Sequence, residues 1–155
     1  MSKTSPIQRQ ARPNDFDDII AVVNDWWGRS VSHAIPRLFL DHFYKTSFVL
    51  RESDQLVGFL IGFFSPSEPL VAYIHFVGIA TSIRKSGLAA KLYKDFFALA
   101  KKNGCSEVHA ITAPVNKGSI EFHRKLGFCV SYPKLGYNEP GKEHVLFKKQ
   151  LHAAA

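Results

Sequence analysis

Residues 71–112 read VAYIHFVGIA-TSIRKSGLAA-KLYKDFFALA-KKNGCSEVHA-IT, and this stretch decides the fold. An apolar segment over 71–80 is typical of a strand, and the amphipathic segment over 87–103 predicts a helix. A second apolar segment over 108–112 predicts another strand, and its nearly continuous apolar character places it inside a sheet. Such a strand–helix–strand unit has a right-handed crossover and pairs its two strands in parallel.

The flanking segments predict antiparallel pairing around that unit. Residues 47–52 and 56–64 read as a hairpin whose turn is Ser53-Asp54-Gln55. The pattern predicts further strands over 7–11, 128–131 and 144–149, and helices over 14–27, 36–44 and 118–126. The expected fold is α/β (α+β), with a mixed, mostly antiparallel central sheet and helices on both faces. The sequence has no repeat or linker, so we predict a single domain over residues 1–155.

Composition limits the classes of partner. The net charge of +7 favours an anionic partner such as a nucleotide cofactor, but no basic run is dense enough to favour nucleic acid. The two cysteines, Cys105 and Cys129, have no metal-motif spacing and are too few for a disulfide framework. Residues 1–10 lack the apolar core of a signal peptide, and the longest apolar run, 56–64, is too short to span a bilayer. We therefore expect a cytoplasmic protein with no membrane partner and no metal.

The segment Arg84-Lys85-Ser86-Gly87-Leu88-Ala89 lies where the first strand leads into the long helix. The first N–H groups of a helix have no partner within the helix, and they point outward with the positive end of the helix dipole. Gly87 lets a backbone approach an anion closely. The position therefore favours a phosphate site, although an ordinary strand–helix connection remains an alternative.

Two motifs together carry a family resemblance. Arg84-x-x-Gly87-x-Ala89 resembles the loop that binds the pyrophosphate of coenzyme A in the GNAT superfamily of N-acetyltransferases. The sequence NKGSIEFHRKLGF over residues 116–128 is similar to the second signature of that family. The resemblance implies a GNAT-like sheet with a splayed parallel strand pair. It also implies acetyl-CoA as the acyl donor, and direct transfer of the acetyl group to an amine.

The resemblance also implies which residues bind the cofactor. Backbone groups from Val77 to Ile79 would pair with the pantetheine arm, and Asn116 would hold that arm or brace two strands. Gly78 is open to two interpretations, a β-bulge or a glycine that makes room for a neighbouring aromatic ring. The full set of expected cofactor residues is Val77, Gly78, Ile79, Arg84, Lys85, Ser86, Gly87, Leu88, Ala89, Asn116 and Ser119.

Three residues are candidates for proton transfer. Simple alternation along the strand places Tyr73, His75 and Val77 on one face, and the family often carries its general base at the position of His75 or of Tyr73. Imidazole has a suitable intrinsic pKa for that task. His123 stands where many relatives have a tyrosine that protonates the leaving sulfur. For both histidines a structural role, buried and hydrogen-bonded, remains an alternative.

The segments expected to bind the acceptor amine are less diagnostic than the two cofactor motifs. Trp26, Trp27 and Tyr132, with Tyr137, are the candidate acceptor-binding residues, although packing in the core or exposure at the surface would also account for them. We predict a primary amine of a small molecule as acceptor. Alternatives are an N-acetyltransferase of proteins or peptides, a catalytically inactive acyl-CoA sensor and an RNA-directed enzyme. A homodimer is left open.

Overall fold

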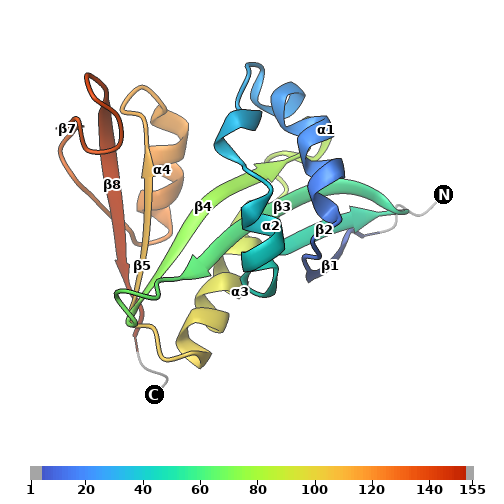
Figure 1. Ribbon diagram of the computed structural model, residues 1–155, viewed down its shortest axis with the longest axis horizontal. Coiled ribbons are helices and arrows are strands. Elements are labelled where there is room, and N and C mark those ends of the chain that lie inside the picture. Colours follow the sequence, from blue (N-terminus) through green and yellow to red (C-terminus); the bar gives the residue numbers. More distant parts are fainter. Residues whose placement is uncertain (1–4, 153–155) are drawn as a thin grey trace. The chain divides into compact units, whose positions relative to one another are not determined.

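The computed structural model describes residues 5–152, and their strands form a mixed sheet of eight strands. The strand order is β1-β2-β3-β4-β5-β8-β6, and β7 pairs with β8 (Figure 1). The strands are β1 (Ile7–Gln10), β2 (Phe48–Glu52), β3 (Gln55–Phe64), β4 (Val71–Ile79), β5 (Glu107–Thr112), β6 (Cys129–Val130), β7 (Lys134–Leu135) and β8 (Glu143–Gln150). The helices are α1 (Asp15–Trp27), α2 (Leu38–Phe43), α3 (Leu88–Lys102) and α4 (Lys117–Lys125), with short 3₁₀ turns η1 (Ser32–Ala34), η2 (Tyr44–Thr46) and η3 (Thr81–Ile83).

The strand–helix–strand unit has the predicted pairing. β4 and β5 are parallel, with Val71 opposite Glu107 and Tyr73 opposite His109. β5 lies between β4 and β8, so the prediction that this apolar strand is internal is confirmed. The pairs β1–β2, β2–β3, β5–β8 and β6–β8 are antiparallel. The predicted mixed, mostly antiparallel sheet is therefore confirmed.

The chain divides into two compact units. The first contains residues 1–63 and 75–96, and the second contains residues 64–74 and 97–155. Strand β4 and helix α3 each contribute residues to both units. The single domain over residues 1–155 stays a prediction, and residues 1–4 and 153–155 lie outside the described part of the chain.

In the first unit, α1 and α2 lie over one face of β2 and β3 (Figure 1). The apolar stripe of α1 provides Ile19 and Val23, which are fully buried, and α2 provides Leu40. They pack in one cluster with strand residues that include Phe59 and Ile61. Burying side chains of this size stabilises each by about 1.5–3 kcal/mol, so the stripe fixes which face of α1 meets the sheet.

The β2–β3 hairpin turns more tightly than predicted. Ser53 and Asp54 both have positive φ, 49° and 66°, which is the pattern of a two-residue type I′ turn. Gln55 is already the first residue of β3, so its assignment to the turn was wrong. Asp and Ser tolerate this left-handed backbone better than most residues, and the I′ turn matches the twist of paired strands.

Two helices begin later than predicted, α1 at Asp15 rather than at residue 14 and α2 at Leu38 rather than at residue 36. Asn14 precedes α1 but makes no capping hydrogen bond; instead the Asp15 carboxylate accepts a bond from the Arg12 backbone N–H at 2.7 Å. Pro36 lies before α2 rather than in its first turn, and its carbonyl accepts from Phe39 N–H at 3.1 Å. At α2 the Pro36 carbonyl satisfies a first-turn N–H that the helix leaves free, whereas at α1 the Asp15 carboxylate binds the backbone of the segment before the helix.

The second unit packs α4 against the sheet through aromatic rings. The His123 ring stacks on Phe147 of β8, with centroids 3.9 Å apart and planes 7° apart. Phe128 meets the same histidine edge-on at 5.0 Å. The short strand β7 was missed by the sequence analysis, because a two-residue strand carries too few side chains to show a period.

Candidate active site

Strand β4 contains one residue more than the part of β3 beside it. At one end Ser65 N–H bonds to Val71 O, and at the other Ala80 N–H bonds to Val57 O, both at 2.9 Å. Eight residue steps lead from 57 to 65, whereas nine lead from 71 to 80. An extra residue on one strand of an antiparallel pair is a β-bulge.

The bulge interrupts the alternation of side chains along β4. His75 stacks on Phe39 of α2, and its neighbour Phe76 packs on Trp27 of α1 with ring centroids 4.5 Å apart. Two successive residues thus contact the helices over one face of the sheet. The simple alternation predicted from Tyr73 to Val77 was therefore wrong, since a bulge reverses the side-chain period from that point onward.

Gly78 makes room for aromatic rings. A Cβ built at this position would lie 2.6 Å from Cε1 of Phe59 and 3.2 Å from Cζ3 of Trp27. Phe59 is fully buried, so its ring has little freedom to move away. The interpretation that Gly78 makes room for a neighbouring aromatic ring therefore has support. The side-chain period of β4 changes at His75 and Phe76, so a bulge at Gly78 itself stays a prediction.

His75 is held by two contacts. Its Nε2–H donates to the carbonyl oxygen of Ala34 at 2.6 Å, because a carbonyl can only accept. Its ring lies 4.0 Å from Phe39 at an interplanar angle of 3°. Burial lowers the pKa of His75, and the hydrogen bond to Ala34 opposes that shift only in part. These contacts would suit a structural role for this half-buried histidine, and a catalytic role for His75 stays a prediction.

The segment Arg84–Ala89 is exposed over its first four residues and has a distinctive backbone. Lys85 and Gly87 both have left-handed φ, at 64° and 84°. A Cβ at Gly87 would meet nothing within 4 Å, so the space beside it is open. Helix α3 begins directly afterwards, and its first recurring bond joins Lys91 N–H to Gly87 O at 3.1 Å. The preceding N–H groups lie before the first helical bond, and their binding of a phosphate stays a prediction.

The side chain of Arg84 binds other parts of the first unit. Its Nη2 donates to the carbonyl oxygen of Trp26 at the end of α1, and its Nε donates to that of Ile79 at 3.3 Å. The family motif places this arginine among the expected cofactor-binding residues, and its contact with Trp26 was not predicted. No local pattern could have identified the contact, since Trp26 and Arg84 are 58 residues apart.

The candidate acceptor residues of α1 are partly buried. Trp26 stacks with Phe59 at 6.1 Å, and Trp27 packs on Phe76. Both indoles belong to the apolar cluster of the first unit. Core packing therefore accounts for much of their surface, and a contact with the acceptor stays a prediction.

In the second unit, Asn116 and Ser119 organise the start of α4. The Asn116 side-chain carbonyl accepts from Ser119 N–H at 3.3 Å, which caps the helix, and its amide donates to Thr112 Oγ1 at 3.2 Å. Asn116 thereby ties α4 to the end of β5, and a role in bracing two strands stays a prediction. A role in cofactor binding for either residue stays a prediction.

His123 is deeply buried, with 5% of its surface exposed. Its Nδ1–H donates to the carbonyl oxygen of Ser119 at 2.7 Å, one helical turn earlier. Burial lowers the pKa of His123, and the bond to Ser119 acts in the opposite direction. The imidazole is therefore neutral near pH 7, and its ring stacking matches the structural alternative.

The tyrosines of the second unit differ in exposure. Burial, with a smaller contribution from Tyr137, raises the pKa of Tyr73 to about 12, so its phenol keeps its proton at neutral pH. Tyr132 is 90% exposed and Tyr137 is 58% exposed. Both exposures match the alternative of surface tyrosines, and a contact of either with the acceptor stays a prediction.

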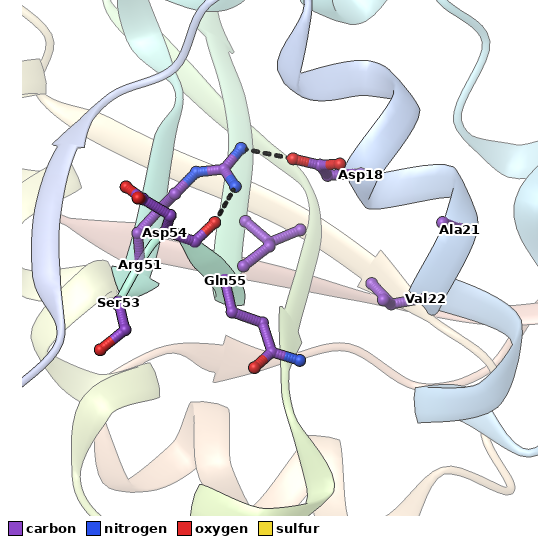
Figure 2. A pocket seen from close by; sticks show the side chains of 8 residues that line it. Asp18, Ala21, Val22, Arg51, Ser53, Asp54 and Gln55 are labelled. Carbon is purple, nitrogen blue, oxygen red and sulfur yellow. Dashed lines mark hydrogen bonds and ion pairs between the residues drawn. The ribbon is translucent and has the colours of Figure 1, made fainter.

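A hollow of about 350 Å³ lies between α1 and the β2–β3 turn in the first unit (Figure 2). Figure 2 shows the Arg51 guanidinium bonded both to Asp18 and to the carbonyl oxygen of Asp54. None of the residues that line this hollow is a predicted site residue, and the charge of Arg51 is already neutralised by carboxylates. Its lining residues are Asp18, Ala21, Val22, Arg51, Ser53, Asp54, Gln55 and Leu56.

Residues 5–152 contain neither a candidate metal centre nor a helix able to cross a membrane. Among these residues, no group of three or more His, Cys, Asp or Glu side chains is placed to hold a metal ion. Within the same range, no helix has the length and apolar character needed to cross a membrane.

Comparisons with known proteins agree with this geometry. The family model described as the acetyltransferase (GNAT) family matches residues 16–128. An L-2,4-diaminobutyric acid acetyltransferase from Halalkalibacterium halodurans is 30% identical over 89 residues, which are 57% of this chain and 47% of that protein. The chain spans about half the length of the curated relatives it matches first.

Solved structures share the fold. A protein assigned to the GNAT family from Desulfovibrio desulfuricans superposes with a TM-score of 0.82 at 16% identity, covering 96% of this chain and 100% of that one. A diaminobutyrate acetyltransferase from Paenibacillus lautus, in complex with L-2,4-diaminobutyric acid and coenzyme A, superposes with a TM-score of 0.76 at 16% identity. It covers 99% of each chain. At these identities the likeness shows the fold alone.

Proposed function

The chain belongs to the acetyltransferase (GNAT) family, and from that premise we propose that it moves an acetyl group from acetyl-CoA to a primary amine of a small molecule. The observation that carries the proposal is the backbone of the segment Arg84–Ala89. Two left-handed residues, Lys85 and Gly87, turn the chain into the start of α3, where free N–H groups and the helix dipole favour a pyrophosphate. Open space beside Gly87 leaves room for the anion.

The end of β4 supports the same donor. Backbone groups from Val77 to Ile79 would pair with the amides of the pantetheine arm, as an added strand pairs with a sheet. The β-bulge in β4 supports this role, because a bulge disrupts the ladder locally and frees backbone groups.

The reaction itself needs little from the protein. The neutral amine nitrogen attacks the thioester carbonyl carbon, the C–S bond breaks, and the amine loses a proton. A free alkylamine has a pKa of about 10, so a base or a water path must take that proton. The leaving thiolate has a pKa of about 8.5 and makes a mild demand on an acid. We propose His75 and Tyr73 as the proton carriers, whereas the buried ring of His123, stacked on Phe147, favours a structural role for that histidine. The hydrogen bond of His75 to Ala34 makes a structural role for His75 testable as well.

For the acceptor, we propose a small primary amine, with L-2,4-diaminobutyric acid as the first compound to test. The support is that relatives named for this substrate match the chain at 26–33% identity. The aromatic side chains of Trp26, Trp27 and Tyr132 are the proposed acceptor contacts. Of these, Tyr132 has the surface most open to a ligand.

The test is an acceptor screen with acetyl-CoA, read by release of the CoA thiol. We expect at least one small primary amine to give acceptor-dependent thiol release, faster than a lysine-bearing peptide at equal concentration. Faster reaction of the peptide would favour an N-acetyltransferase of proteins or peptides. Binding of acetyl-CoA without release for any acceptor would indicate a sensor, and no binding at all would overturn the proposal.

A further inference from the structure

The guanidinium of Arg84 joins three parts of the first unit. The residue itself begins the proposed pyrophosphate loop. Its Nη2 donates to the carbonyl oxygen of Trp26, in the last turn of α1, and its Nε donates to Ile79 O at the end of β4. Two donors of one planar group thus reach two backbone carbonyls, a geometry that the single ammonium of a lysine does not reproduce.

The end of α1 needs such a cation. The last four carbonyls of a helix have no partner within the helix and carry its negative dipole end. The last turn of α1, from Asn24 to Trp27, contains no basic residue and contains the acidic Asp25. Gly28 N–H bonds to Asn24 O at 2.9 Å. Arg84 therefore places, from 58 residues away, a positive charge on a carbonyl of a last turn that has no basic residue of its own.

The same turn carries both tryptophans of the chain. Trp27 packs on Phe76 of the bulged strand, and Trp26 stacks on Phe59. The turn is thus attached to the sheet by aromatic packing and to the loop by Arg84. A change in the conformation of the loop therefore affects the two indoles directly, because Arg84 binds the backbone of Trp26 itself.

We propose that Arg84 is a positioning residue that couples the proposed pyrophosphate loop to the C-terminal turn of α1. CoA bound at the loop stabilises the loop conformation from which Arg84 reaches Trp26 O, and this in turn orders the turn that carries Trp26 and Trp27. By reciprocity, a ligand that orders this turn raises the affinity of the loop for CoA. The inference rests on the proposed function, since it takes CoA as the occupant of the loop.

The test compares two charge changes in one loop. Arg84→Lys keeps the positive charge but loses the planar fork, whereas Lys85→Gln removes a charge and leaves the fork intact. Both side chains are exposed, so neither change threatens the core. For each protein, CoA affinity is measured by calorimetry at two salt concentrations, and tryptophan emission is recorded during the same titration. Thermal melting confirms that each variant is folded.

We expect CoA to change tryptophan emission in the wild-type protein. Arg84→Lys should weaken CoA binding about tenfold, with an unchanged salt dependence, and should lose most of the emission change at saturating CoA. Lys85→Gln should reduce the salt dependence and keep the emission change. Arg84→Gln, which loses charge and fork together, should show both defects.

Two results would overturn the coupling. One is an emission change in Arg84→Lys equal to that of the wild-type protein; the other is wild-type binding of CoA with no emission change. A wild-type protein that gives no heat of CoA binding would instead overturn the proposed function, and the inference with it. These outcomes are distinct, because calorimetry reports occupancy of the loop independently of the tryptophans.

Discussion

The Nε2–H of His75 donates to the carbonyl oxygen of Ala34 across 2.6 Å, and this bond ties the bulged strand β4 to the turn before α2. The bond needs a protonated Nε2, which leaves Nδ1 as the unprotonated nitrogen of the neutral ring. Since burial also lowers the pKa of His75, the neutral form predominates at pH 7. The His75 imidazole therefore has the neutral form that a general base needs, but its hydrogen bond to Ala34 fixes the ring between β4 and the turn before α2.

This bridge predicts a pH-dependent stability. The folded-state pKa of His75 lies below its ordinary value, so the unfolded chain binds the proton more readily. Stability is therefore complete above about pH 6.5 and is lost as the pH falls through the folded-state pKa. We expect His75→Gln to reduce this loss, measured by urea unfolding at neutral and mildly acidic pH. The exposed His33→Gln is the control, and an equal effect there would contradict the assignment.

His123 is expected to act mainly through packing. Replacing it by Phe keeps a ring on Phe147 but removes the bond to the Ser119 carbonyl. We expect His123→Phe to unfold within about 1 kcal/mol of the wild-type protein and to keep turnover within about tenfold. Denaturant unfolding and thiol-release kinetics measure the two effects. A loss of turnover beyond about a hundredfold in the folded variant would assign proton transfer to His123.

Gly87 should matter for CoA and much less for the fold. An alanine at φ 84° costs about 1–2 kcal/mol, but its Cβ meets no protein atom within 4 Å. That Cβ would stand where the pyrophosphate approaches the backbone, so we expect Gly87→Ala to weaken CoA binding tenfold or more in calorimetry. Gly104→Ala is the matched control, because Gly104 has φ 89° and similarly open surroundings after α3. Equal affinities of the two variants would remove the loop glycine from the site.

Gly78 should be intolerant of a side chain. Its added Cβ would lie 2.6 Å from the buried ring of Phe59, and packing leaves that ring little room. We expect Gly78→Ala to lower the free energy of unfolding by about 1–3 kcal/mol, read from urea denaturation. Gly118 lies in the first turn of α4 with no atom within 4 Å of its Cβ, so Gly118→Ala should be neutral or slightly stabilising. Similar destabilisation of both would rule out the contact with Phe59 as the cause.

Asp15 should hold the start of α1 through buried charge. Burial alone raises the pKa of its carboxyl, but bonds from Arg9, Arg51 and Arg12 N–H outweigh burial and bring the pKa below its ordinary value. This stability is present above about pH 4 and is lost as the pH falls through the folded-state pKa. We expect Asp15→Asn to cost about 2–3 kcal/mol at pH 7 in denaturant unfolding, because two guanidinium groups lose their shared partner.

The control for Asp15 is Asp17→Asn. Asp17 is 78% exposed and reaches Arg37 only at 3.8 Å, so its loss should be nearly neutral. A cost for Asp17→Asn equal to that for Asp15→Asn would show that general charge at the helix start, rather than the buried network, provides the stability.

Local pattern predicted most of the fold. The period of α3, the apolar run of β5 and the order of elements were enough to predict the parallel β4–β5 pair and the mixed sheet, because these features depend on neighbours in the chain. The loop Arg84–Ala89 was predicted in the same way, from its place between a strand and a helix. The prediction failed where a strand or a turn differed by one residue from the expected length, as in the bulge of β4 and the two-residue turn at Ser53 and Asp54.

The sequence by itself therefore determined the family, the sheet and the proposed donor loop. Short motifs and the periodic spacing of apolar residues depend only on residues that are close together in the chain. Only the tertiary structure decided what individual side chains bind. It placed His75 on the Ala34 carbonyl, Gly78 beneath Phe59, and Arg84 on the end of α1. Each of these contacts joins residues far apart in the chain, and it depends on the direction of a side chain that a sequence pattern does not contain.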